Sequence, residues 1–226
     1  TVKHRVISSN QHLLRIDDEE SNPLDKNLED NFISHSLKML KQFKPDAIVF
    51  EDYDKGNVTP LIISQVVKFA NENKIPTLVD PKKRNFEHYK NVTLFKPNFK
   101  ELMEGMKLEG VPRNNSKAVA DAANALLKHL NATYVMVTLS EYGILITNGE
   151  ECFHMLAQKR EISDVSGAGD TVISVSAVAL SCGIKADVVA TIANIAGGLV
   201  CEKPGVVPID KESLLSESIE YFKTQD

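Results

Sequence analysis

The sequence predicts a three-layer α/β/α protein, in which a mostly parallel sheet lies between two layers of helices. Short apolar segments, such as 47–50 and 134–138, alternate along the chain with segments whose apolar residues recur at helical spacing. The short segments are uniformly apolar, which is typical of strands buried on both faces of a parallel sheet. Hydrophobic residues make up 42% of the chain and charged residues 25%, as in an ordinary globular domain.

The amino-terminal part predicts a hairpin and then the first strand–helix pairs. Residues 1–17 alternate like two short strands around a turn at 8–10, and an acidic loop follows over 18–29. A helix is expected from about 28 to 43, where large apolar residues recur at helical spacing. After the strand at 47–50, Thr59-Pro60 starts a helix, with Thr as N-cap and Pro in the first turn.

The remaining elements follow the same alternation. Further strands are expected at 76–80, 92–95 and 134–138, and a hairpin of strands 144–147 and 152–155 across Asn148-Gly149. Helices are expected at 117–130, 169–182, 187–202 and 211–223. Since no internal repeat or linker interrupts this order, we expect residues 1–226 to form one domain. The chain begins with Thr1 rather than Met, in a stretch that already alternates like a strand, so we expect an amino-terminal segment to be missing.

Composition excludes several classes of protein. The net charge is −5 and no long run of Lys or Arg is present, which argues against a nucleic-acid partner. No apolar stretch is long enough to span a membrane, and we expect no signal peptide. The three cysteines are scattered and fit neither a disulfide framework nor a metal site, so a reducing, cytoplasmic compartment is expected. Cys182 and Cys201 fall in apolar helices and are expected to be small core residues.

Polar residues recur where the expected central strands end. They are Glu51-Asp52, Asp80, residues 96–98 and Thr138. In parallel sheets ligands bind beyond the carboxyl ends of the strands, so these positions predict the location of a site.

The strongest chemical signal is the segment 164–171, which directly precedes an apolar helix. Its residues Gly167, Ala168 and Gly169 would expose backbone N–H groups at a helix N-terminus, which is an anion hole suited to a phosphoryl group. Asp170 could take the proton of an attacking hydroxyl. The alternative is a glycine-rich turn with Asp170 as an ordinary N-cap; the flanking Asp164 and the long apolar helix favour the functional interpretation.

This segment, Asp-Val-Ser-Gly-Ala-Gly-Asp, resembles the carboxyl-terminal signature of the ribokinase-like, or PfkB, carbohydrate kinases. The resemblance implies a ribokinase-like fold with a partial β lid, ATP and Mg²⁺ as cofactors, and Asp170 as the catalytic base beside the anion hole. It also implies a monovalent cation such as K⁺ near Asp164 and Ser166.

Two further segments resemble that family. Residues 96–101 resemble its Pro-Asn-x-x-Glu segment, which implies that Asn98 and Glu101 contribute to the phosphate–magnesium site, in part through water. The alternative is a helix capping box, and both interpretations can hold together. Residues 137–143 resemble its nucleotide loop, which implies nucleotide contacts for Thr138, Ser140 and Gly143, although Ser140 replaces the usual glycine.

The helix near 193–198 resembles the family's adenine-side helix, with Asn194 as the candidate nucleotide contact and Gly205 in the loop beyond it. For the two glycines of this helix, a close helix–helix contact is at least as good an explanation.

The amino-terminal half resembles one subfamily, the bacterial D-glycero-β-D-manno-heptose-7-phosphate kinases. Residues 1–17 look like part of the sugar-covering lid, and residues 52–56 and 79–82 look like two more segments of that subfamily. The resemblance, together with the cations a phosphorylated sugar needs, implies these substrate contacts: Lys3, Arg5, Asn10, Asp52, Lys55 and Lys82. For each lysine alone, a solvated surface charge is the alternative. Glu51 departs from the small residue usual in the subfamily.

The expected function is therefore an ATP-dependent sugar kinase that phosphorylates O1 of D-glycero-D-manno-heptose 7-phosphate, a step toward lipopolysaccharide. The alternatives are another sugar or nucleoside kinase and a non-catalytic nucleotide-binding relative. Because lid strands in this family often pair between subunits, a homodimer is expected.

Overall fold

The computed structural model describes residues 2–8 and 11–224. Within the first two strands it leaves out the side chains of Lys3, Arg5, Ile7, Ser8, Gln11, His12 and Arg15. The body is built on a six-stranded sheet with the order β3-β4-β5-β6-β7-β8. These strands are β3 (Ile48–Glu51), β4 (Thr77–Asp80), β5 (Leu94–Phe95), β6 (Tyr134–Thr138), β7 (Ile144–Thr147) and β8 (Cys152–Met155). β3 to β6 pair in parallel, and β7 and β8 are antiparallel, so the expectation of a mostly parallel sheet is confirmed.

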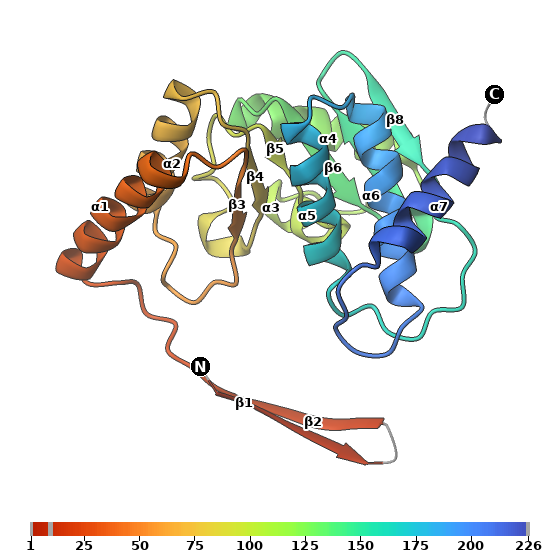
Figure 1. Ribbon diagram of the computed structural model, residues 1–226, viewed down its shortest axis with the longest axis horizontal. Helices are drawn as coiled ribbons and strands as arrows, with labels where there is room; N and C mark the ends of the chain where they lie inside the picture. Colours follow the sequence, from red (N-terminus) through yellow and green to blue (C-terminus); the bar gives the residue numbers. More distant parts are fainter. Residues whose placement is uncertain (1, 9–10, 225–226) are drawn as a thin grey trace.

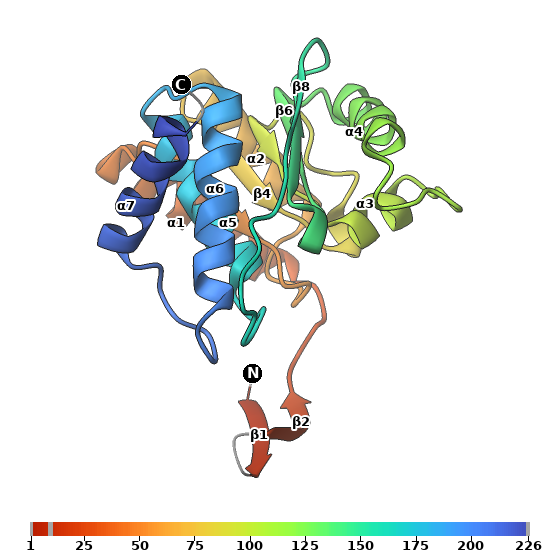
Figure 2. The same cartoon turned by 90° about the vertical axis from the view of Figure 1, so that its right-hand side faces the viewer.

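Helices cover both faces of the sheet. One layer contains α2 (Pro60–Glu72), α3 (Phe99–Gly105) and α4 (Ser116–Leu130), and α1 (Lys26–Phe43) packs on α2. The other layer contains α5 (Ala168–Ser181) and α6 (Ala186–Cys201), with α7 (Lys211–Lys223) against α6. Figure 2 shows α3 and α4 on one side of the sheet and α5 and α6 on the other. The predicted three-layer architecture is therefore confirmed.

The alternation of buried side chains explains why two cores form. Successive strand residues point to opposite faces, so Val79 packs with the α2–α4 layer and its neighbour Leu78 packs with the α5–α6 layer. In β5, Phe95 likewise packs with the α2–α4 layer and Leu94 with the α5–α6 layer. All four side chains are fully buried. A strand that is apolar at every position therefore supplies both cores, which is the pattern from which the parallel sheet was predicted.

Most predicted elements lie within one or two residues of the observed ones. Thr59 caps α2 as expected, because its hydroxyl accepts from the Ile62 N–H, and Pro60 is the first helical residue. The expected strand at 92–95 shortens to the two residues of β5. The apolar stripe of α1 is only partly covered, because this helix packs against α2 at the margin of the fold and has no fully buried residue.

The expectation for the cysteines was half wrong. Cys201 is buried in α6, but Cys182 is exposed. Cys182 is the C-cap of α5, where the helix ends and the chain turns outward, so its apolar helical neighbours do not enclose it.

Among the described residues, no helix combines the length and apolar character needed to cross a bilayer.

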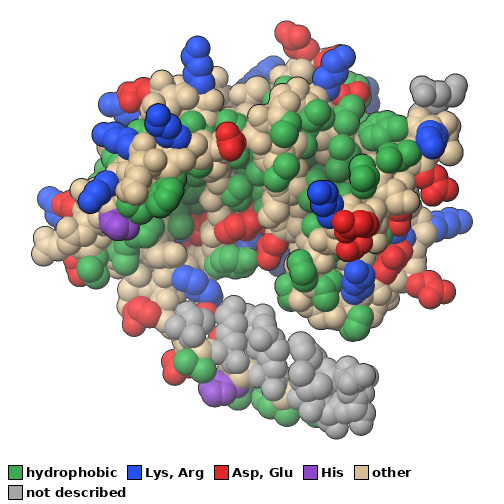
Figure 3. Space-filling view, viewed as in Figure 1, with side chains coloured by type: hydrophobic (Ala, Val, Ile, Leu, Met, Phe, Trp, Pro, Cys, Tyr) green, Lys and Arg blue, Asp and Glu red, His purple; other side chains and the backbone are tan. Residues whose placement is uncertain are grey.

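A two-stranded hairpin stands apart from the body. Its strands are β1 (Val2–Ser8) and β2 (Gln11–Asp18), which pair only with each other, and it projects below the sheet (Figure 1). The turn between them falls on residues 9 and 10, outside the described part of the chain. The apolar side chains Val2, Val6, Leu14 and Ile16 are all about half exposed. In the space-filling view, acidic side chains are visible in the hollow of the body that the hairpin faces (Figure 3).

The turn between β6 and β7 depends on two unusual backbone conformations. Ser140 has φ 54°, in the left-handed region that favours glycine, so the loop keeps a glycine-like backbone although the side chain is serine. Gly143 has φ 87°, and a Cβ there would lie 1.9 Å from the Met155 carbonyl oxygen. Gly149, in the β7–β8 turn, has φ 92° but would meet only Leu127 at 3.5 Å.

These contacts predict different costs for two alanine substitutions. Gly143→Ala adds a collision with backbone to the strain of positive φ, so it should cost about 3 kcal/mol or more. The matched Gly149→Ala should cost about 1–2 kcal/mol, since only the backbone strain applies. Urea denaturation of both variants measures the difference. Equal losses would show that the packing of residue 143 against residue 155 does not constrain this turn.

Candidate active site

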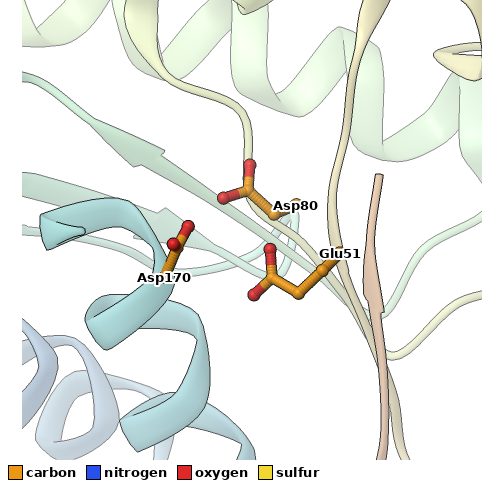
Figure 4. Close-up of side chains that lie close together, drawn as sticks. All are labelled: Glu51, Asp80 and Asp170. Atoms are coloured by element: carbon orange, nitrogen blue, oxygen red, sulfur yellow. The ribbon is translucent and has the colours of Figure 1, made fainter. Parts of the chain in front are cut away.

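The carboxyl ends of the parallel strands meet the amino-terminal end of α5. Glu51 is the last residue of β3, Asp80 is the last residue of β4, and Asp170 lies in the first turn of α5. Oxygens of these three carboxylates lie within 4.8 Å of one another, and Figure 4 shows the side chains converging on one point. The strand-end residues and the Gly-Ala-Gly-Asp segment, which are far apart in the sequence, thus form one site.

A buried ion pair lies beneath this site. The Lys96 ammonium is 2.9 Å from Asp80 Oδ2, and the side chains are only 3% and 12% exposed. Lys96 directly follows β5, so the register of the sheet places it next to the end of β4. A Cβ on Gly169 would be 3.6 Å from this ammonium, which shows that the start of α5 lies directly beside the pair. Asp80 Oδ2 would be equally close to that Cβ, at 3.5 Å, so the ammonium and the carboxylate of the pair both lie beside the Gly169 backbone.

Burial and neighbouring carboxylates alter the protonation of Glu51. Burial, together with the charges of Asp80 and Asp170, raises the pKa of Glu51 to about 7. Lys96 and Lys82 oppose this shift but do not cancel it. Glu51 thus changes its charge near neutral pH.

The start of α5 is suited to an anion. Its N-cap is Gly167, with φ 83°, which supplies no side chain to the helix's first N–H groups. Five other α-helices of the described chain begin with a capping side chain: α1, α2, α3, α4 and α7. The first helical bond of α5 runs from the Thr171 N–H to the Gly167 carbonyl at 2.9 Å. The positive end of the helix dipole at Ala168 and Gly169 would stabilise negative charge there.

A second group of residues lies at the start of α3. Asn98 and Glu101 form a complete capping box, with both hydrogen bonds at 2.9 Å. The other Glu101 oxygen accepts from Lys82 at 2.6 Å. Burial opposes the charge of Lys82, but Glu101 and Asp80 outweigh it and raise the pKa of its ammonium. The capping interpretation is confirmed, and the magnesium role of Asn98 and Glu101 stays a prediction.

Asp164 joins the loop before α5 to the loop between α6 and α7. Its Oδ1 accepts from the Ser166 N–H at 2.9 Å, and its Oδ2 accepts from the Gly205 N–H at 3.1 Å. A Cβ on Gly167 would lie 3.1 Å from a Val206 methyl group, so the two loops pack closely. The structure thus brings the expected cation residues together with Gly205, while the cation itself stays a prediction.

The expected nucleotide residues lie along the same edge of the fold. Thr138 ends β6 and forms a parallel bridge with Asn98. Asn194, on α6, donates to the Leu156 carbonyl at 2.8 Å and so ties the end of β8 to the helix. The Ser140 hydroxyl is 3.5 Å from Arg113. Nucleotide contacts for Thr138, Ser140, Gly143, Asn194 and Gly205 stay predictions.

The expected substrate residues fall into two sets. Asp52 is 3% exposed and accepts from the Asp54 N–H, the Asn85 amide and the Tyr89 hydroxyl at 2.8–3.0 Å, so it shapes the loop after β3. Lys55 forms an ion pair with Glu19, which links this loop to the end of the hairpin. The side chains of Lys3 and Arg5 and the whole of Asn10 lie outside the described residues. Their roles in substrate binding stay predictions.

Two residues of the site could not be assigned from a motif. Lys96 was recognised only as polar and at a strand end, but it is the buried partner of Asp80. Tyr53 donates its hydroxyl to Asp170 Oδ2 at 3.0 Å, across 117 positions of sequence. The signal available for Lys96 was its place after a central strand, and for Tyr53 no sequence signal pointed to α5.

Comparison with known proteins assigns the chain to a family. The family model described as "pfkB family carbohydrate kinase" matches residues 7–212. Among curated proteins, the chain is 31% identical over 214 residues to the bifunctional protein HldE of Koribacter versatilis, covering 95% of this chain and 43% of that protein. It is 35% identical over 212 residues to HldE of Mesorhizobium japonicum, covering 94% and 42%. The chain thus spans less than half the length of these relatives.

Solved structures share the fold at lower identity. Escherichia coli phosphofructokinase-2 in complex with potassium superposes with a TM-score of 0.75 at 18% identity, covering 94% of this chain and 67% of that chain. The same enzyme with fructose-6-phosphate also gives 0.75 at 18% identity, covering 96% and 68%. Arabidopsis thaliana ribokinase with ribose and ATP gives 0.67 at 19% identity, covering 88% and 61%.

The raised pKa of Glu51 predicts a pH-dependent effect of Glu51→Gln on stability. The pKa of Glu51 in the folded protein lies above its ordinary value of 4.5, so the stabilisation from Glu51 is complete below about pH 4.5 and is lost as pH rises through about 7. The Gln side chain does not ionise, so the melting temperature of the variant should exceed that of the wild type at pH 8 and approach it at pH 5. Thermal melts at both pH values measure this, and a difference that is the same at both would contradict it.

Proposed function

Because the chain belongs to the pfkB family of carbohydrate kinases, we propose that it transfers the γ-phosphoryl group of ATP to a hydroxyl of a sugar, with Asp170 as the base. The observation that carries this proposal is the position of Asp170 in the first turn of a helix whose start is suited to an anion. Acceptor hydroxyl and phosphoryl group would meet there, between the carboxylate and the backbone N–H groups.

The chemistry follows from this placement. Asp170 accepts the proton of the attacking hydroxyl, and the N–H groups of Gly167–Gly169 stabilise the charge that develops on the phosphoryl oxygens. Lys96 adds positive charge from beneath, held by Asp80. Phosphoryl transfer consists largely of positioning and electrostatic stabilisation, and these groups supply both.

The proposed cations fit the residues present to different degrees. Bound Mg²⁺ would supply positive charge that neutralises the phosphates of the nucleotide. Both Glu101 oxygens already accept hydrogen bonds, from Lys82 and from the Asn98 N–H, so Asn98 and Glu101 would hold the ion through water. A monovalent cation such as K⁺ would lie at Asp164 and Ser166, where the carboxylate joins two loops.

For the acceptor we propose a phosphorylated sugar, specifically O1 of D-glycero-D-manno-heptose 7-phosphate on the route to lipopolysaccharide. Lys55 and Lys82 supply cations around the loop after β3, and one of the solved neighbours carries fructose-6-phosphate.

The second candidate is a kinase for another sugar or a nucleoside. Glu51 favours it, since a half-buried carboxyl beside the base is a departure from the heptose-phosphate pattern. A non-catalytic nucleotide-binding relative is the third.

The proposal extends to assembly and location. The half-exposed apolar side chains of the β1–β2 hairpin, with their two free strand edges, favour a homodimer in which lid hairpins pair between subunits. Three unpaired cysteines and the use of ATP favour the cytoplasm. We treat residues 1–226 as a single kinase domain.

Asp170→Asn should abolish phosphoryl transfer and leave ATP affinity nearly unchanged. The amide keeps the shape of the side chain but cannot accept the hydroxyl proton, and loss of a general base costs on the order of 10²–10⁴ in rate. Coupled ADP-release assays measure turnover, and calorimetry measures nucleotide binding. A variant that keeps more than about half of the wild-type rate would exclude Asp170 as the base.

The acceptor should be preferred when it already carries a phosphate. A hydrogen bond to a charged group contributes roughly 1.5–3 kcal/mol, so two cationic contacts would give about a hundredfold or greater preference in kcat/KM. Neutral sugars would make no such contacts, and Lys55 and Lys82 would then keep only their carboxylate partners Glu19 and Glu101. Kinetics with heptose 7-phosphate, heptose, fructose and ribose measure the preference, and equal turnover of the neutral sugars would leave only the general sugar-kinase proposal.

A further inference from the structure

Tyr53 makes a direct contact with the proposed base that the phosphoryl-transfer chemistry above does not use. Its hydroxyl lies 3.0 Å from Asp170 Oδ2. Tyr53 follows β3 at the second position after Glu51, so both residues come from the same strand end and both interact with Asp170. Alternate residues of an extended chain point to the same side, which explains why Glu51 and Tyr53 face the helix while Asp52 points into the body.

The loop that carries Tyr53 is fixed on both sides of this residue. Asp52 is held by the Asn85 amide and the Tyr89 hydroxyl, in a position that is 3% exposed. Asp54, with φ 58°, forms an ion pair of 2.7 Å with Arg84. Tyr53 itself is 53% exposed, so packing does not account for its orientation. The hydrogen bond to Asp170, made from this rigid loop, accounts for the orientation of the Tyr53 side chain instead.

In the hydrogen bond between Tyr53 and Asp170, the phenol is the donor and the carboxylate is the acceptor. Burial and the hydrogen bond and charge of Asp170 raise the pKa of Tyr53 to about 12, with Glu51 and Asp80 adding to the shift. The phenol therefore keeps its proton throughout the neutral range and donates it to the carboxylate. An ionised carboxylate has two acceptor oxygens, and the bond engages Oδ2, so Oδ1 remains available to an acceptor hydroxyl.

We propose that Tyr53 is a positioning residue for Asp170: by donating to Oδ2 it fixes the rotation of the carboxylate, so that Oδ1 faces the acceptor hydroxyl. This inference rests on the proposed kinase function, since it assigns a partner to the base of that reaction. Without the phenol, the carboxylate is surrounded by Glu51 and Asp80 and is repelled by both when they are ionised. Misplacement of a catalytic group by a fraction of an ångström to 1 Å lowers the rate of the chemical step rather than substrate affinity.

Kinetics of Tyr53→Phe test the proposal, because this change removes only the hydroxyl. The expected result is a fall in kcat of about tenfold, with the KM values for ATP and the acceptor changed less than about twofold. Tyr221→Phe is the matched control: it removes a phenol hydroxyl on α7, where the ring packs edge-on against Phe222, and should leave kcat unchanged. An unchanged kcat in Tyr53→Phe, or a lower acceptor KM showing that the phenol merely blocks the site, would overturn the proposal.

A second measurement does not depend on turnover. Melting temperatures of Tyr53→Phe, Asp170→Ala and the double variant form a double-mutant cycle. If the bond exists in solution, Tyr53→Phe should lower the melting temperature of the wild type but not that of Asp170→Ala. Equal shifts in both backgrounds would overturn the proposal. Absence of turnover by the wild-type chain would instead count against the proposed function, and the cycle would still show whether Tyr53 holds Asp170.

Discussion

The site depends on one geometric constraint, which is that parallel strands all end at the same edge of their sheet. β3, β4 and β5 end there with Glu51, Asp80 and, one residue later, Lys96. Packing of α5 across β3 and β4 brings its first turn, with Asp170, to that edge. The ion pair with Lys96 stabilises the buried carboxylate of Asp80 at this edge, because a buried carboxylate without a partner would be strongly destabilising.

The charge balance of this edge connects the fold to the proposed chemistry. Three carboxylates lie within 4.8 Å, and the buried ammonium of Lys96 neutralises only one of them. The raised pKa of Glu51 reduces the negative charge that this side chain carries near neutral pH. The phenol of Tyr53 stabilises the charge of Asp170 by donating a hydrogen bond to it. Lys96 pairs with one carboxylate of this group, Asp80, and the backbone at the start of α5 lies beside that pair. The proposed base and the proposed anion hole therefore lie side by side.

Sequence reasoning predicted the features that depend on local pattern. Strand and helix order followed from apolar periodicity, and the start of α5 followed from a contiguous motif. The failures have physical causes: Cys182 lies in an apolar helix but at its exposed end, and the bond between Tyr53 and Asp170 joins positions 117 residues apart. Polar residues were recognised at the strand ends, but the partners of Lys96 and Lys82 are set by sheet register and loop shape, which no single segment encodes.

The most direct test of the proposed site is a crystal structure of the chain with Mg²⁺, a non-hydrolysable ATP analogue and the acceptor sugar. The γ-phosphate should lie against the N–H groups of residues 167–169. The acceptor hydroxyl should lie within hydrogen-bond reach of Asp170, about 2.6–3.2 Å. A nucleotide whose phosphates lie away from the start of α5, or an acceptor hydroxyl that contacts a different carboxylate, would contradict the assignment of Asp170 as the base.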